Sequence, residues 1–128
     1  KLDAATAENF MLINRGVDVV SFDRMVSSLC AFRKRFKGRL ALQIMFIEDN
    51  RHQAKNIAEI AKKIGPDEVQ INTPLRPCAT KPLTEKQISA IKKEFIDLDV
   101  VAVYDALTKP FSPFDEARTK ARHGNYRS

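Results

Sequence analysis

The chain has 128 residues, of which 44% are hydrophobic and 30% are charged, and its formal net charge is +6. This length and composition fit one globular domain with a core of its own and exclude a disordered chain. No apolar run approaches the roughly 18 residues that a membrane helix needs, so we expect no membrane partner.

The cysteines and histidines predict no self-sufficient metal site. Cys30 and Cys78 lie far apart in the sequence, and His52 and His123 stand alone. Two such cysteines do not make a disulfide framework, and they fit a reducing, cytoplasmic setting. The sequence also has no CxxC, CxxxCxxC or HExxH motif.

In the first half of the chain, the sequence predicts a strand end, two helices and a full strand. Residues 1–4 resemble the end of a strand that begins before Lys1. Thr6 caps a short helix that ends near Gly16. Ser21 caps the next helix, over residues 22–36, where apolar residues recur at helical spacing. Residues 40–47 then predict a strand that is apolar on both faces, except at one glutamine.

The next unit repeats this pattern. Asn50 and Gln53 form a capping-box-like pair at the start of a helix, and Gly65 ends that helix. Residues 68–72 predict a short strand in which apolar and polar side chains alternate. This strand continues directly into a loop that two prolines, Pro74 and Pro77, make stiff.

The last unit completes an α/β pattern. Thr84 and Gln87 form a capping box, and residues 100–104 predict the final strand. Strands that alternate with helices predict a parallel sheet, either a βα-barrel, part of one, or an open sheet of the flavodoxin kind. No glycine-rich phosphate loop follows any strand, which disfavours a dinucleotide fold or a P-loop. We divide the chain into a βα unit, 1–105, and a basic tail, 106–128.

Polar side chains recur at matching parity on the predicted strands, which would place them on one face near the strand C-termini. These residues are Lys1, Asp3, Gln43, Gln70 and Asn72. In βα-barrels this end holds the active site, so the pattern favours a binding site. The alternative is that each polar group satisfies a local backbone group.

Each candidate side chain has a chemical role that it could fill. Arg76 could bind a carboxylate or phosphate with two hydrogen bonds, or form a surface salt bridge. Lys1 could pair with Asp3 or with a substrate acid. Asn72 and Thr73 could hydrogen-bond a purine or an amino-acid group. The two strand glutamines could bridge a ligand or each other, and Cys78 could be reactive or a ligand for something outside this chain.

Four stretches together resemble the C-terminal half of radical S-adenosylmethionine proteins. They are Lys1-Leu-Asp-Ala4, Ile13-Asn-Arg15, residues 36–47, and residues 66–78 with the motif Asn-Thr-Pro-Leu-Arg-Pro-Cys. The resemblance implies half of a partial (β/α)6 TIM-like barrel that supplies the wall formed by strands four to six. It implies cofactor contacts at Asp3, Gln43, Asn72, Thr73 and Leu75. It implies substrate contacts at Lys1, Gln70 and Arg76.

The chain departs from the pattern of this family in an important respect, because the CxxxCxxC motif that holds the [4Fe–4S] cluster is absent from its sequence. S-adenosylmethionine and the cluster are therefore implied only for a longer protein, and no metal ligand or catalytic residue is predicted here. The chain would be part of an enzyme, inactive alone, with an unknown small-molecule substrate. We expect its exposed barrel edges to promote self-association.

Two other functions stay open. The first is a non-catalytic α/β module whose basic tail contacts an acidic or nucleic-acid partner. A nucleic acid is not the expected partner, because no basic stripe interleaves with aromatic residues. The second is an unrelated βα enzyme that uses Asp3, Asp105 and Arg76. A CxxxCxxC motif upstream of Lys1 would support the radical-enzyme interpretation over both.

Overall fold

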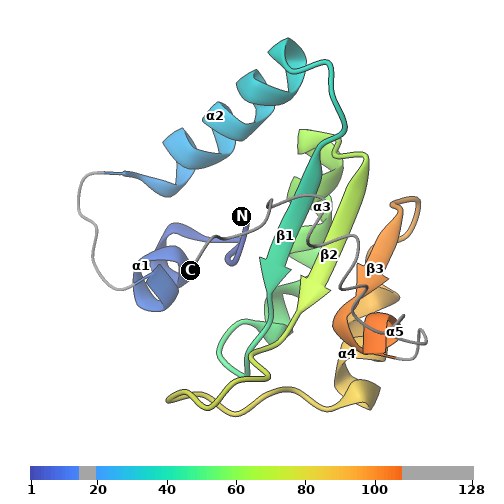
Figure 1. Cartoon of the computed structure of the whole chain (residues 1–128). Helices are drawn as coiled ribbons and strands as arrows, with labels where there is room; N and C mark the ends of the chain where they lie inside the picture. The colour runs from blue at the N-terminus through green and yellow to red at the C-terminus, as the bar shows by residue number, and fades with distance from the viewer. Residues whose placement is uncertain (15–19, 108–128) are drawn as a thin grey trace, which may run out of the picture.

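A three-stranded parallel sheet lies at the centre of the fold (Figure 1). The computed structural model describes residues 1–14 and 20–107. The strands are β1 (Ala41–Met45), β2 (Glu68–Asn72) and β3 (Val100–Ala102), and they lie side by side in sequence order. The α/β class and the parallel sheet predicted from the sequence are therefore confirmed.

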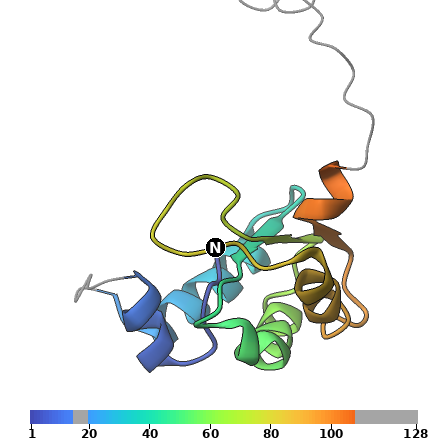
Figure 2. The same ribbon diagram turned by 90° about the horizontal axis from the view of Figure 1, so that it is seen from below.

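Within residues 1–14 and 20–107, five helices and one 3-10 turn connect or flank the strands. They are α1 (Ala7–Asn14), α2 (Phe22–Arg35), the turn η1 (Arg51–Gln53), α3 (Ala54–Ile64), α4 (Glu85–Lys92) and α5 (Val103–Leu107). Seen along the sheet, α3 and α4 lie on one side of the strands, and the loop after β2 lies on the other side (Figure 2). None of the helices within 1–14 and 20–107 is both long enough and apolar enough to cross a bilayer.

The core fills the space between the sheet and the helices that cover it. The strand side chains on this face are Leu42, Ile44, Val69, Ile71 and Ala102, all buried. They pack with buried side chains from α3, α4 and the segments that flank them: Ile57, Ala58, Ala61, Ile88, Ile91 and Phe95. Burial of this apolar face is the main stabilising term, at about 25 cal/mol per Å².

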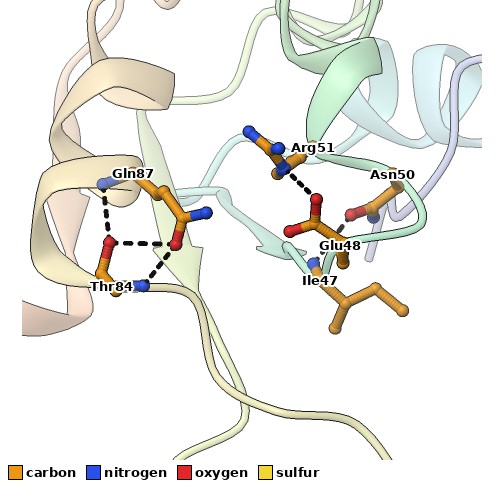
Figure 3. A network of polar contacts seen from close by, with 6 residues as sticks. All are labelled: Ile47, Glu48, Asn50, Arg51, Thr84 and Gln87. Atoms are coloured by element: carbon orange, nitrogen blue, oxygen red, sulfur yellow. Dashed lines mark hydrogen bonds and ion pairs between the residues drawn. The ribbon is translucent and has the colours of Figure 1, made fainter.

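Local capping signals fix the helix ends as the sequence predicts. The Ser21 hydroxyl accepts a hydrogen bond from the Arg24 N–H, at 3.2 Å, and begins α2. Thr84 and Gln87 form the reciprocal capping box of α4, which Figure 3 shows. Gly65 ends α3 with a left-handed backbone, φ 71°, which a side chain would disfavour.

Three predicted details are wrong at the strand ends. Residues 1–4 are extended beside β1, with one backbone bond from Leu2 N–H to the Gln43 carbonyl (3.0 Å), but they form no strand. The last strand ends at Ala102 and not at residue 104, because Asp105 accepts the Ala102 N–H (3.1 Å) and α5 begins at Val103. Asn50 does not cap α3 with its side chain.

The second face of the sheet carries the polar side chains. Gln43 and Gln70 are paired neighbours on β1 and β2, and Met45 is paired with Asn72. Along each strand these residues alternate with the buried ones. Parallel sheets in folded domains are normally covered on both faces, so a second face whose side chains are exposed or only partly buried marks where further contacts can form.

Helix α2 lies at the edge of the molecule and packs on α3. Its inward side chains are only partly buried. Phe32 on its exposed side stacks on Phe36, the residue that follows the helix, with ring centres 5.1 Å apart. The Gly16 helix end and the basic tail beyond residue 107 were also predicted from the sequence, but both lie outside the described residues.

Candidate functional site

Asp3 and Asn50 form a saturated polar network at the end of β1. The Asp3 carboxylate accepts the Met45 N–H at 2.8 Å and pairs with the Lys1 ammonium at 3.2 Å. The fully buried Asn50 amide donates to the carbonyls of Asp3 (2.8 Å) and Met45 (2.9 Å), and its oxygen accepts the Ile47 N–H at 2.8 Å. Figure 3 shows the last of these bonds.

Gln53 extends this network to the start of α1. Its side-chain oxygen accepts the Ala5 N–H at 3.0 Å, and its amide donates to the Thr6 hydroxyl at 3.4 Å. Asn50 and Gln53 therefore do not form the capping pair that the sequence predicts; instead they hold residues 3–6 against β1. We call Asp3, Asn50 and Gln53 the polar clasp.

A cleft of about 610 Å³ lies at the C-terminal ends of the strands, on the second face of the sheet. Its lining residues come from β1, β2, the loop after β2, and the start of α5. They are Gln43, Met45, Asn72, Thr73, Pro74, Leu75, Arg76, Cys78 and Val103. This position, where parallel strands end, is the usual place for a ligand site in α/β proteins.

The loop after β2 is fixed at its base. The buried Thr73 hydroxyl accepts the Leu83 N–H at 2.8 Å, and the Tyr104 hydroxyl donates to the Leu83 carbonyl at 2.7 Å. Both backbone groups of Leu83 are thus satisfied, and the two ends of the loop are held together. Pro74 and Pro77 restrict the backbone between these ends, so the cleft has a side wall with few conformations.

Among the described residues that line the cleft, one is charged, and its charge is positive. Arg76 is exposed and forms no ion pair with any residue of 1–14 and 20–107. The lining residues include no aspartate or glutamate. The Cys78 thiol lies 3.1 Å from the Thr80 carbonyl, to which it donates. The surface salt bridge proposed as the alternative for Arg76 is therefore absent among the described residues.

The structure brings together five of the eight predicted site residues. Gln43, Asn72, Thr73, Leu75 and Arg76 all line the cleft. Lys1 and Asp3 belong to the edge beside β1, where they pair with each other. Gln70 donates to Glu68 at 2.7 Å and not to its neighbour Gln43. Which of these side chains contact a ligand stays a prediction.

Sequence reasoning predicted Leu75 but missed the other apolar residues of the cleft. Met45 and Val103 line it, beside Pro74 and Leu75. A signal was present for Met45, because it shares the strand parity of Gln43. No such signal was present for Val103, because the sequence predicts it within a strand, whereas in the structure it begins α5.

At the opposite ends of the strands, charged residues are paired. The Arg33 guanidinium contacts both oxygens of Asp67 at 3.0 Å, and Arg39 pairs with Glu68 at 2.7 Å. The Leu40 N–H, which donates to Asp67 at 2.7 Å, lowers the pKa of that carboxyl below its ordinary value. Partial desolvation raises this pKa, and the charges of Arg33 and Arg39 lower it further. Asp67 and Glu68 at this end are therefore each paired with an arginine.

Other candidate groups do not converge on the cleft. Asp105, proposed with Asp3 and Arg76 for an unrelated enzyme, pairs with Lys92 at 2.6 Å and is not among the lining residues. Across the part of the chain that the structure describes, no three side chains of His, Cys, Asp or Glu gather into a possible metal site. Cys30 and Cys78 are both free.

Comparisons with known proteins found three relatives of interest. No protein-family model and no solved structure matches the chain. It is similar to a protein named GTPase Obg from Brachyspira hyodysenteriae, with 34% identity over 115 residues, which is 81% of this chain and 17% of that protein. It is also similar to a UPF0026 protein of Methanocaldococcus jannaschii, with 28% identity over 73% of this chain and 30% of that protein.

The third relative is a UPF0026 protein of Synechocystis, with 31% identity over 84 residues, which is 65% of this chain and 31% of that protein. The chain therefore spans less than a third of the length of each of these relatives.

These relatives overturn the resemblance to radical S-adenosylmethionine proteins. Their names refer to a GTPase and to UPF0026 proteins, and nothing in the comparisons points to radical enzymes. The metal binding that this resemblance implied for a longer protein is contradicted as well, since the described residues hold no group of His, Cys, Asp or Glu that could bind a metal ion. S-adenosylmethionine and the [4Fe–4S] cluster were implied by that resemblance alone, and no finding supports them.

The resemblance to radical enzymes was wrong for a physical reason, which lies in the motif of residues 72–78. Its threonine closes the loop onto Leu83, and its prolines stiffen the backbone. Such a stretch is explained by local loop geometry, so it is weak support for a particular family.

Proposed function

We propose that this chain is a small-molecule binding module that supplies one wall of a ligand pocket at the C-terminal ends of its strands. The observation that carries the proposal is the cleft itself, where two side-chain amides, Gln43 and Asn72, lie beside Arg76, which has no ion pair within residues 1–14 and 20–107. Pockets of this kind combine apolar lining with a few polar groups that fix the orientation of a ligand. The remaining wall would come from the larger protein.

The finer architecture, half of a partial (β/α)6 barrel, is part of this proposal. Two features support it. The strands follow one another in sequence order, with α3 and α4 on one side, as the outer helices of a barrel would be. The chain also spans only 17% to 31% of the three relatives, which leaves room for further strands. The inner face of such a barrel would be the face that carries Gln43 and Asn72.

We do not extend GTP hydrolysis to this chain. The match to the protein named GTPase Obg covers 17% of that protein, and the sequence here contains no GxxxxGK[ST] motif. The cytoplasmic location predicted from the two cysteines, the self-association through sheet edges and the binding of a partner by the basic tail also stay predictions.

A fragment screen by NMR tests the proposed function. Small neutral and charged aromatic compounds should shift the amide signals of the cleft residues. The competing hollow is the one of about 530 Å³ beside Phe32 and Phe36 on α2. If the shifts cluster at α2 and leave the cleft unchanged, the proposed function is wrong.

A matched pair of variants makes this test specific. Leu75 is 48% exposed in the cleft, and Leu12 is 61% exposed on α1. Because neither side chain belongs to the core, Leu75→Ser and Leu12→Ser should both leave the fold intact. Only Leu75→Ser should weaken the binding of apolar compounds, by several-fold, because it removes part of the apolar wall.

A further inference from the structure

We infer that the ligand of the cleft is an anion with a compact, planar or apolar body, held through its carboxylate or phosphate by Arg76. This inference rests on the proposed function and specifies its ligand. It follows from three properties of the lining: its charge, its apolar surface and its two amide groups.

The charge selects for an anion. Among the described residues that line the cleft, Arg76 alone is charged, and none is acidic and able to repel a negative group. Arginine binds carboxylates and phosphates with paired N–H donors in a fixed planar geometry. Since Arg76 has no ion pair within the described residues, a ligand need not displace a protein carboxylate from it.

The apolar lining of the cleft favours a ligand with an apolar body over a bare inorganic ion. Met45, Pro74, Leu75 and Val103 contribute a large part of the lining, and Leu75 is half exposed. A ligand body that covers these side chains removes apolar area from water, which is favourable at about 25 cal/mol per Å². A volume of about 610 Å³ accommodates an aromatic ring with its substituents.

The side-chain amides of Gln43 and Asn72 can hydrogen-bond to polar atoms at the edge of a ligand ring. Asn72 is paired with Met45 across the strands, and Gln43 lies two residues before Met45 on the same face. The two amides are therefore diagonal neighbours on the same face of the sheet. Each amide can donate and accept, so a ring with heteroatoms at its edge would be favoured over a plain hydrocarbon ring.

NMR titrations with four probes test this inference: benzoate, phenyl phosphate, inorganic phosphate and the neutral benzamide. We expect benzoate and phenyl phosphate to shift the cleft signals at concentrations at least about tenfold lower than inorganic phosphate or benzamide require. Benzoate and phenyl phosphate distinguish a carboxylate ligand from a phosphate ligand. If inorganic phosphate binds as well as phenyl phosphate, the apolar body is not required and the inference is wrong.

Variants that remove one positive charge test whether Arg76 is the residue that binds the anion. Arg76→Gln should weaken benzoate binding about tenfold and leave benzamide binding unchanged. The control is Arg24→Gln, which removes an exposed arginine from α2 and should change neither. If benzamide and benzoate bind the cleft equally and Arg76→Gln has no effect, the ligand class is wrong while the proposed function stands. If no probe shifts the cleft, both are wrong.

Discussion

Two groups of polar side chains lie near the C-terminal ends of the strands, and they differ in how their hydrogen-bonding capacity is used. The polar clasp of Asp3, Asn50 and Gln53 is buried. Its side chains bond mainly to backbone groups, namely those of Asp3 and Ala5 and those of β1 and its exit. In the cleft, Gln43 is exposed and Arg76 has no ion pair among the described residues.

The difference separates two roles that look alike in a sequence. A buried polar group must be satisfied within the protein, because leaving it without a partner costs about 1–3 kcal/mol. An exposed polar group in a cleft is satisfied by water and can exchange that water for a ligand. Substitutions in the clasp should therefore change stability, and substitutions in the cleft should change binding.

The largest effect is expected at Asn50. Asn50→Ala removes one acceptor and two donors from a fully buried site, so we expect a loss of about 3 kcal/mol or more in the free energy of unfolding, measured with urea. The control is Asn56→Ala, at an exposed position of α3, which should change it by less than about 0.5 kcal/mol. Equal effects of the two substitutions would contradict the role of the clasp.

A smaller effect is expected at the base of the loop. Thr73→Val keeps the shape of the side chain but leaves the Leu83 N–H without its acceptor, which should cost about 1–2 kcal/mol. Tyr104→Phe removes the bond to the Leu83 carbonyl and should cost about 1 kcal/mol.

Because both bonds hold the same residue, we expect the double variant to deviate from additivity in urea unfolding. Thr73→Val should also weaken ligand binding through the loop. Unchanged stability in both single variants would show that Leu83 is not the anchor of the loop.

The ion pairs at the N-terminal ends of the strands should contribute a modest, pH-dependent stability. The folded state lowers the pKa of Asp67, chiefly through the Leu40 N–H, so the contribution is present above the ordinary value of 3.8. It is lost as the pH falls below 3.8 toward the lowered value. Unfolding measured between pH 6 and pH 2 should show this loss in the unaltered chain, and Asp67→Asn should reduce it. An identical pH profile for that variant would contradict the assignment.

The smallest stability effect is expected in the cleft. Gln43→Ala and Asn72→Ala remove amides that bond to no described side chain, so each should change the free energy of unfolding by less than about 0.5 kcal/mol. The same variants should weaken the binding of the aromatic anions by a few-fold. A large destabilisation by either variant would place these residues with the clasp.

The parts of the fold that depend on nearby residues could be predicted from the sequence. The Ser21 cap, the Thr84–Gln87 box and the Gly65 end of α3 all act within one helical turn. Strand parity likewise placed Gln43 and Asn72 on one face, because side chains alternate along a strand. These predictions needed no knowledge of the tertiary structure.

The clasp could not be predicted, because its partners are distant in the chain. Asp3 bonds to Met45, 42 residues away, and Asn50 bonds to Asp3 across 47 residues. From the sequence, Asp3 therefore resembled a ligand group and Asn50 a helix cap. The relation to radical enzymes failed for a similar reason, since a short proline-stiffened motif reports on its own loop and not on the rest of the protein.

The side-chain amide signals of four residues test the central claim most directly. Asn50 and Gln53 belong to the clasp, and Gln43 and Asn72 belong to the cleft. On titration with benzoate, we predict that the NH2 signals of Gln43 and Asn72 shift while those of Asn50 and Gln53 stay fixed. Shifts confined to Asn50 and Gln53, or no difference between the two pairs, would contradict the division between a structural clasp and a binding cleft.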